Sequence, residues 1–163
     1  MPVPSRALEL EQHAVDRVAR SLPAAFGLLR EHWEAGDRDR EVGLHLLFLA
    51  WYLETEPPYL TGSDGTAHAT EEHHAAVALV HDAFASTIMQ DAEMLFVVGV
   101  MATLAARCLG DEAAWLARGD TYLAACGRLS PDGIAPDVFD GRGYYGHYFV
   151  GHARRHAGWR SPS

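Results

Sequence analysis

The sequence predicts an all-α fold of about seven antiparallel helices in a single domain of 163 residues. Apolar side chains recur about every three to four positions along most of the chain. No stretch sustains the residue-by-residue alternation that marks a half-buried strand. Gly, Pro, Ser and Asp stand where helices would begin and end, and 48% hydrophobic with 21% charged residues is typical of a globular chain.

Four helices are expected in the first half of the chain, over residues 5–20, 21–35, 37–56 and 71–86. Each begins at a residue whose side-chain oxygen can accept from the free N–H groups of the first turn. These expected N-caps are Ser5, Ser21, Asp37 and Thr70. The apolar face of the first helix is expected at Leu8, Val15, Val18 and Leu22.

The third of these helices is expected to be the central one. Residues 44–53 are apolar on every side except at His45, a pattern that predicts burial all round. His45 follows Glu41 by one helical turn. We interpret His45 as a core histidine with a satisfied imidazole rather than as a catalytic base.

Three more helices are expected in the second half, over residues 91–110, 111–129 and 143–157. Asp91 and Asp111 are the expected caps of the first two, and Pro131 breaks the chain after the second. The longest apolar stretch, residues 94–106, is shorter than the roughly 20 residues that span a bilayer, so it predicts a buried core helix.

The N-terminal residues contain no apolar segment of the kind found in signal peptides, so we expect a cytoplasmic protein. Cys108 and Cys126 should lie too far apart on two helices for a disulfide, which predicts reduced thiols. The chain has no Lys and no Asn, which excludes P-loop and Schiff-base lysines. With its abundant Ala, Gly and Arg, this composition is typical of a bacterial genome of high GC content.

One short segment has the spacing of a known repeat. Trp115, Gly119 and Tyr122 are spaced as in the first helix of a tetratricopeptide repeat, which the segment resembles. Arg118 stands where that family has Leu, and the fixed period of the repeat is absent. The resemblance implies pairs of antiparallel helices stacked as in a short solenoid.

The two halves of the chain, residues 22–89 and 90–163, have similar residues at the starts and ends of their expected helices. Gly36 and Gly110 are each followed by Asp at the start of a long helix, and each such helix is stopped by Pro. Two interpretations stay open: an internal duplication, or similar turn chemistry on unrelated helices.

Charge is distributed unevenly along the chain, whose formal net charge is −9. Between Arg40 and Arg107 there are nine acidic residues and no cation, whereas residues 141–163 hold four Arg and no acid. The negative net charge argues against a nucleic-acid partner. Two interpretations fit the pattern: a solvated acidic face with a basic tail against it, or a cationic partner for the centre and an anionic ligand for the tail.

An aromatic and acidic cluster is expected at the end of the central helix. It consists of Trp51, Tyr52, Glu54, Glu56 and Tyr59. Rigid aromatic rings beside carboxylates are typical anchors for a protein or peptide. We expect a groove lined by this cluster and by three residues of the last helix, which are Arg142, Tyr144 and Tyr148.

Residues 141–146 spell G-x-G-x-x-G, the fingerprint of dinucleotide-binding loops. Residues 130–140 make a poor strand, and no acidic residue follows Asp140, so the structural context of that fingerprint is missing. We interpret the glycines as positions of close helix packing. An anion held beside Arg142 by the free N–H groups of the helix start is the alternative.

Ten histidines raise a metal-binding alternative. The candidate ligands lie at helical spacing on two segments and are Glu71, His74, His81, His152 and His156. Zinc or iron would be the metal that imidazole and carboxylate ligands favour. This hypothesis predicts that at least three such side chains converge within coordination distance.

We therefore expect a helical scaffold without catalytic activity or cofactor that binds a protein or peptide, a second copy of itself included. We expect no contact with nucleic acid or membrane. The alternative is a small helical bundle, with or without catalytic activity, that binds a divalent metal or an anionic ligand through clustered His, Glu and Arg.

Overall fold

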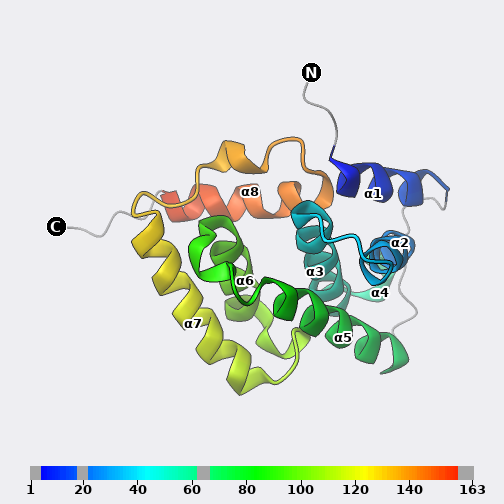
Figure 1. Cartoon of the computed structure of the whole chain (residues 1–163), viewed down its shortest axis with the longest axis horizontal. Helices are drawn as coiled ribbons and strands as arrows, with labels where there is room; N and C mark the ends of the chain where they lie inside the picture. The colour runs from blue at the N-terminus through cyan, green and yellow to red at the C-terminus, as the bar shows by residue number, and fades with distance from the viewer. Residues whose placement is uncertain (1–4, 18–21, 62–66, 158–163) are drawn as a thin grey trace. The chain divides into compact units, whose positions relative to one another are not determined.

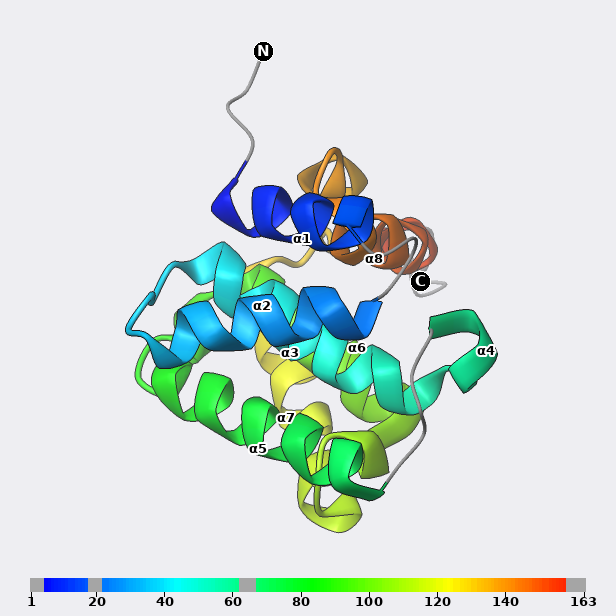
Figure 2. The same cartoon turned by 90° about the vertical axis from the view of Figure 1, so that its right-hand side faces the viewer.

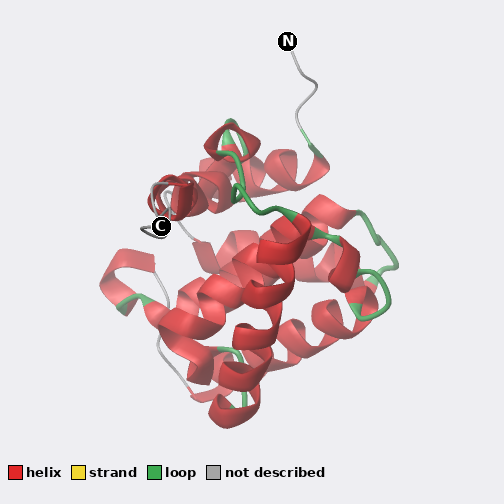
Figure 3. Ribbon diagram, turned by 90° about the vertical axis from the view of Figure 1, so that its left-hand side faces the viewer, coloured by secondary structure: helices red, strands yellow, loops and turns green. Residues whose placement is uncertain are grey.

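The structure is a computed structural model that describes residues 5–17, 22–61 and 67–157. Over these residues the chain forms eight α-helices, three short 3-10 helices and no strand, which confirms the expected all-α fold (Figures 1 and 3). The chain divides into two compact units. Unit 1 comprises residues 1–83 and 108–110, and unit 2 comprises residues 84–107 and 111–163.

The described part of unit 1 is built from helices that follow one another along the chain (Figure 2). They are α1 (Arg6–Arg17), α2 (Leu22–Glu34), α3 (Arg40–Thr55), α4 (Pro58–Thr61) and α5 (Ala67–Phe84, in this unit up to Ala83). α2 packs against both α1 and α3, and α1 also contacts α3. Successive helices therefore pair with their neighbours in sequence, as the short connections predict.

α3 is the core helix of unit 1, as its apolar pattern predicts. Every residue from Val42 to Trp51 is buried, and so is Leu53. α2 contributes an apolar stripe at helical spacing, formed by Leu22, Ala25, Phe26, Leu29 and Trp33. Burial of these side chains against α3 supplies the hydrophobic stabilisation of the unit.

The N-cap of α3 is Asp39, so the expected cap at Asp37 is wrong by two positions. The Asp39 carboxylate accepts from the backbone N–H groups of Glu41 and Val42 at 3.0 and 3.2 Å. Asp37 accepts from the N–H of Asp39 at 3.1 Å and forms an ion pair with Arg6 of α1. The two Asp residues offer the same capping chemistry, and the tertiary contact with α1 decides between them.

The ends of two other elements also differ from the prediction. α5 begins at Ala67, so Thr70 lies inside the helix and is not its cap. After Pro57 the chain forms the extra short helix α4, because Pro58 can occupy the first turn of a helix without losing a hydrogen bond.

The expected start of the first helix is confirmed. The hydroxyl of Ser5 accepts from the N–H of Leu8 at 3.2 Å, which is the capping geometry. The expected continuation of this helix to Arg20 and the expected cap at Ser21 lie outside the described residues.

Unit 2 contains the helices α6 (Ala92–Ala105), α7 (Glu112–Leu129) and α8 (Gly143–Ala157). It also contains the 3-10 helices η1 (Ile88–Gln90), η2 (Ala106–Cys108) and η3 (Pro136–Phe139), although Cys108 at the end of η2 belongs to unit 1. Asp91 and Asp111 cap α6 and α7 as expected, accepting from the N–H groups of Met94 and Ala114 at 3.0 and 2.8 Å. α6 is buried on all sides from Met94 to Ala102 but ends at Ala105 instead of the expected Gly110.

α6 and α7 form the closest helix pair of unit 2. A Cβ placed on Gly119 of α7 would lie 2.7 Å from Cβ of Ala102, and one on Gly99 of α6 would lie 2.6 Å from Cγ of Leu123. Gly99 faces Leu123, whereas Ala102, three residues further along α6, faces Gly119, four residues earlier on α7. The two helices therefore run antiparallel. Gly119 thus allows the backbones of α6 and α7 to approach closely.

The same helix offers a matched test of this packing. Gly119→Ala should lower the free energy of unfolding of unit 2 by about 1 to 2 kcal/mol, because the added methyl group overlaps Ala102. Gly127→Ala on the same helix meets nothing within 4 Å and should raise it by up to about 1 kcal/mol through helix propensity. Urea unfolding of both variants measures the two effects, and equal shifts would contradict the close α6–α7 approach.

The remaining core of unit 2 is aromatic. Phe139 of η3 lies 6.0 Å from the ring of Phe149 and 6.2 Å from that of Phe96, and Tyr145 lies 5.2 Å from Phe149.

Cys126 is a buried thiol on α7, and burial raises its pKa. Among the described residues no helix is long and apolar enough to cross a bilayer. An internal duplication and similar turn chemistry both stay open for the two halves of the chain, and the stacking of helix pairs as a short solenoid stays a prediction.

Candidate functional site

The expected aromatic and acidic cluster at the end of α3 is only partly a surface. Trp51 is buried in the core of unit 1, so it contributes to packing and not to a groove. Tyr52 is half-buried, and its ring lies 5.2 Å from that of Phe48 one turn earlier. Trp51 and Tyr52 therefore stabilise the end of α3 by packing.

Glu54 has a structural role between two helices. Its Oε1 lies 2.6 Å from Nδ1 of His73, and its Oε2 accepts from the hydroxyl of Thr70 at 3.1 Å. His73 is buried, and the ring of Phe26 of α2 contacts it edge-on with centroids 4.8 Å apart. Both carboxylate oxygens of Glu54 thus hold α5 against α3 and are occupied.

The exposed part of the cluster is α4 together with the proline before it. Pro57, Pro58, Tyr59 and Leu60 are all exposed, with Tyr59 at 83% and Leu60 at 59%. Thr61 directly after them is fully buried and anchors the short helix. We call the four exposed residues 57–60 the α4 tip. Unit 1 thereby exposes a tyrosine and a leucine at consecutive positions of a short helix.

Glu56 connects the α4 tip to the core helix. It is half-buried and follows the last residue of α3, where its N–H donates to the carbonyl oxygen of Tyr52 at 3.0 Å. Its backbone therefore closes α3, and Glu56 directly precedes Pro57, the first residue of the α4 tip.

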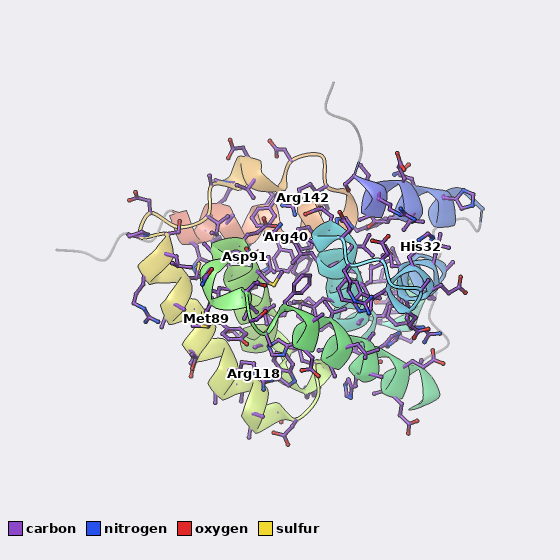
Figure 4. All side chains as sticks on the ribbon, viewed as in Figure 1. His32, Arg40, Met89, Asp91, Arg118 and Arg142 are labelled. Atoms are coloured by element: carbon purple, nitrogen blue, oxygen red, sulfur yellow. The ribbon has the colours of Figure 1, made fainter. Side chains whose placement is uncertain are left out.

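In unit 2 the expected site residue Arg142 directly precedes α8 (Figure 4). Its Nη1 lies 2.7 Å from Oε1 of Glu93 on α6 and 3.1 Å from the carbonyl oxygen of Val138. The guanidinium also covers the ring of Tyr145, with 4.9 Å from Cζ to the ring centroid. Arg142 therefore connects the start of α8 to α6.

The two expected tyrosines of α8 differ in exposure. Tyr144 is 37% exposed, whereas Tyr148 is half-buried with its ring 5.1 Å from those of Phe149 and His152. Tyr144 and Tyr148 lie on a different unit from the α4 tip, so the expected common groove stays a prediction.

A surface pocket of about 250 Å³ lies at the start of α8. It is lined by residues 139–143 and by Gly146, His147 and Val150, so it coincides with the glycine-rich motif. The N–H groups of a helix start attract anions. Glu93 lies against the Arg142 guanidinium, however, and its carboxylate opposes any anion that would use this cation. The residues before the motif form the 3-10 helix η3 and no strand.

The metal alternative gains no geometric support. Among the residues that the structure describes, no group of three or more His, Cys, Asp or Glu side chains is placed to hold a metal ion. Glu71, His74 and His81 lie on α5, and His152 and His156 lie on α8. Nδ1 of His152 accepts from Nη2 of Arg155 at 3.1 Å, and burial, with the nearby charges of Arg155 and His156, lowers the pKa of His152.

The interpretation of His45 as a buried histidine of the core is confirmed. It is fully buried on α3, and its Nε2 lies 3.5 Å from Oε2 of Glu41. The partner that sequence reasoning missed is Glu11, whose Oε2 lies 2.8 Å from Nδ1 of His45. Glu11 and His45 are 34 positions apart, so no local pattern pairs them.

His73 was also missed, although a signal for it exists. Ala76, Val77 and Val80 form the buried face of α5, and His73 precedes them at the same helical spacing. That spacing places His73 on the core side of the helix, where an imidazole needs a partner.

Comparison of the chain with protein-family models, with curated proteins and with solved structures finds no match.

Proposed function

We propose that the chain is a non-catalytic helical scaffold that binds a basic and apolar segment of another protein through the α4 tip. The proposal rests on the exposure of Tyr59 and Leu60, two large apolar side chains next to each other on a short helix. Tyrosine anchors are frequent at the centre of protein interfaces because they bury a large area at a small cost in side-chain entropy.

The backbone of the α4 tip is suited to binding without rearrangement. Two consecutive prolines fix the chain before Tyr59, and buried Thr61 holds the other end of the helix. A rigid site loses little conformational entropy when a ligand binds, so more of the contact energy appears as affinity.

The charge around the tip selects the partner class. Residues 41–83 of unit 1 carry seven acidic residues and no Lys or Arg, and Glu56 directly precedes the tip in sequence. Glu71 and Asp82 are exposed on α5 of the same unit. A segment that combines Arg or Lys with apolar side chains is therefore complementary to unit 1. The proposed partner is bound in the cytoplasm, in keeping with the expected location.

Panning a display library of random short peptides on the full chain tests the proposal. We expect enriched peptides to combine basic with aromatic or aliphatic residues and to bind more weakly as ionic strength rises. The double variant Tyr59→Ser, Leu60→Ser should bind the same synthetic peptides at least about tenfold more weakly, because the apolar anchors are lost.

Leu79→Ser is the matched control, because Leu79 is 51% exposed on α5 of the same unit but lies outside the α4 tip. Its peptide affinity should equal that of the unaltered chain. Acidic peptides among the selected sequences, or equal binding by the tip variant, would contradict the proposal. A chain that sedimentation shows to be a dimer, and that the tip variant makes monomeric, would assign the tip to a second copy instead.

A further inference from the structure

The carboxylate of Glu56 stands next to the α4 tip and forms no hydrogen bond or ion pair with any described residue. Glu56 is half-buried and directly precedes Pro57, the first residue of the tip. Its backbone N–H closes α3 by donating to the carbonyl oxygen of Tyr52 at 3.0 Å. The backbone of Glu56 thus serves the fold, whereas its side chain is available to a ligand.

The other described acids between residues 41 and 83 are paired or lie away from the tip. Three of them are paired with side chains of the same unit: Glu41 with Arg40, Glu54 with His73 and Thr70, and Glu72 with Arg30. Glu71 and Asp82 are exposed on α5. Glu56 is therefore the described acid that a ligand on the α4 tip would meet first.

Unit 2 shows what a carboxylate and a tyrosine ring can hold together. Nη1 of Arg142 lies 2.7 Å from Oε1 of Glu93, and its Cζ lies 4.9 Å from the ring centroid of Tyr145. A guanidinium suits this arrangement because its planar group pairs with a carboxylate and stacks on an aromatic ring at the same time. Glu56 and Tyr59 offer the same two groups, and no described arginine pairs with either.

Glu56 and Tyr59 are close enough for one arginine to reach both. Tyr59 follows Glu56 by three positions, so their Cα atoms are at most about 11 Å apart. The N–H of Leu60 donates to the carbonyl oxygen of Pro57 at 2.9 Å, so the segment between them is bent and the distance is shorter. The ring of Tyr59 is accessible, since the residue is 83% exposed.

The half-buried position of Glu56 strengthens its attraction for a cation. Water screens a carboxylate less when part of the group is removed from solvent. The prolines that follow also fix the backbone between Glu56 and the tyrosine. The carboxylate and the ring are therefore held near each other before a ligand arrives.

We propose that the α4 tip recognises an arginine of its partner, whose guanidinium pairs with the Glu56 carboxylate and stacks on the Tyr59 ring. Leu60 contacts an apolar neighbour of that arginine. The arginine site rests on the proposed function, because it takes the α4 tip as the binding surface. It deepens that function by assigning the choice of partner to one carboxylate and one ring rather than to the negative charge of unit 1 as a whole.

Lysine fits such a site less well than arginine. Its ammonium group is a compact and strongly hydrated charge, which pairs with a carboxylate but does not stack flat on a ring. The overall negative field of unit 1, by contrast, attracts Lys and Arg alike because it depends on charge alone. A preference for Arg over Lys therefore separates a local site from the general field.

Panning a random peptide library in which Arg and Lys are equally frequent tests this preference. Peptides selected on the unaltered chain should contain Arg more often than Lys, and the excess should be smaller on Glu56→Gln. Asp82→Asn is the matched control, because it also removes one negative charge from unit 1 and should leave the excess unchanged. Asp82 is near the end of α5, and Figure 2 shows that end on the opposite side of the unit from α4.

Isothermal titration calorimetry with one selected peptide measures the contact itself. Replacing the arginine of the peptide by lysine should weaken binding about threefold, and replacing it by glutamine about tenfold. Glu56→Gln should bind the arginine peptide about fivefold more weakly and the glutamine peptide as the unaltered chain does, because that peptide has no guanidinium to lose. Asp82→Asn should distinguish the two peptides as the unaltered chain does.

Each outcome decides for or against the arginine site. Equal losses for both peptides on Glu56→Gln, or equal binding of the arginine and lysine peptides to the unaltered chain, would overturn it. If the Tyr59→Ser, Leu60→Ser variant nevertheless loses affinity, the tip stays the binding surface and only the arginine site fails.

If the tip variant binds as the unaltered chain does, or if no peptide is selected, the proposed function fails and the arginine site with it. Circular dichroism shows whether Glu56→Gln is folded. If it is not, the arginine and lysine peptides still decide, because their comparison uses the unaltered chain.

Discussion

Gly146→Ala should lower the free energy of unfolding of unit 2 by about 3 kcal/mol or more. A Cβ on Gly146 would lie 2.1 Å from the carbonyl oxygen of Phe139 and 2.9 Å from Cβ of Arg142. The nearest atom belongs to backbone, so rotation of a flexible side chain cannot relieve the overlap. Either α8 or η3 must move, and movement of η3 withdraws the ring of Phe139 from its contacts with Phe149 and Tyr145.

Gly151→Ala is the control on the same helix. A Cβ at Gly151 meets nothing within 4 Å, so this variant should be neutral or more stable by up to about 1 kcal/mol. Urea unfolding compares the two variants, and amide exchange of α8 and α3 shows which unit is affected. Equal stability of both variants would contradict the placement of η3 against the start of α8.

The long apolar helices were the most predictable part of the fold. α3 is buried on every side from Val42 to Trp51, and α6 from Met94 to Ala102. Residues 44–53 and 94–106 predict this burial because no polar face interrupts them, but Leu104 near the end of α6 is 52% exposed. Caps formed by a single acidic residue, as at Asp91 and Asp111, were also predictable, since each stands alone before its helix. Where Asp37 and Asp39 compete, local chemistry is equal and the Arg6 contact decides.

The face of α1 shows why a pattern can mislead. Leu8 was expected on the buried face, but the structure buries Ala7 and Glu11 and leaves Leu8 half-buried. The rule that apolar residues point inward failed because His45 of α3 provides an ionic partner for Glu11. Such a pairing depends on residues 34 positions apart, and a single sequence contains no signal for it.

The candidate site was predictable in part. The segment around Tyr59 was recognised from its aromatic and acidic composition, but exposure depends on the tertiary structure. Trp51 and Tyr59 are similar in chemistry and eight positions apart, yet one is buried in the core and the other is 83% exposed. The two prolines between them end α3 and turn the chain away from the core.

Glu93→Ala should lower the free energy of unfolding of unit 2 by about 3 kcal/mol. Oε1 of Glu93 accepts from the hydroxyl of Tyr145 at 2.6 Å and lies 2.7 Å from Nη1 of Arg142. Tyr145 is fully buried, so its hydroxyl cannot recover a hydrogen bond from bulk water when the carboxylate is removed. Arg142 also loses its ion pair with Glu93, which joins the start of α8 to α6.

Glu112→Ala is the matched control for the position of Glu93 in its helix. Both acids lie in the first turn of a helix behind an Asp N-cap, so both interact favourably with the helix dipole, by about 0.3 to 1 kcal/mol. Glu112 is exposed, and its removal should cost only this amount.

The cost of Glu93→Ala beyond that of Glu112→Ala therefore measures the contacts with Tyr145 and Arg142. In a double-mutant cycle with Tyr145→Phe, the two substitutions should cost less together than the sum of their separate effects, because the phenylalanine leaves no hydroxyl unsatisfied. Additive effects, measured by urea unfolding, would show that Glu93 and Tyr145 stabilise unit 2 independently. The hydrogen bond between α6 and α8 would then have no part in holding the start of α8.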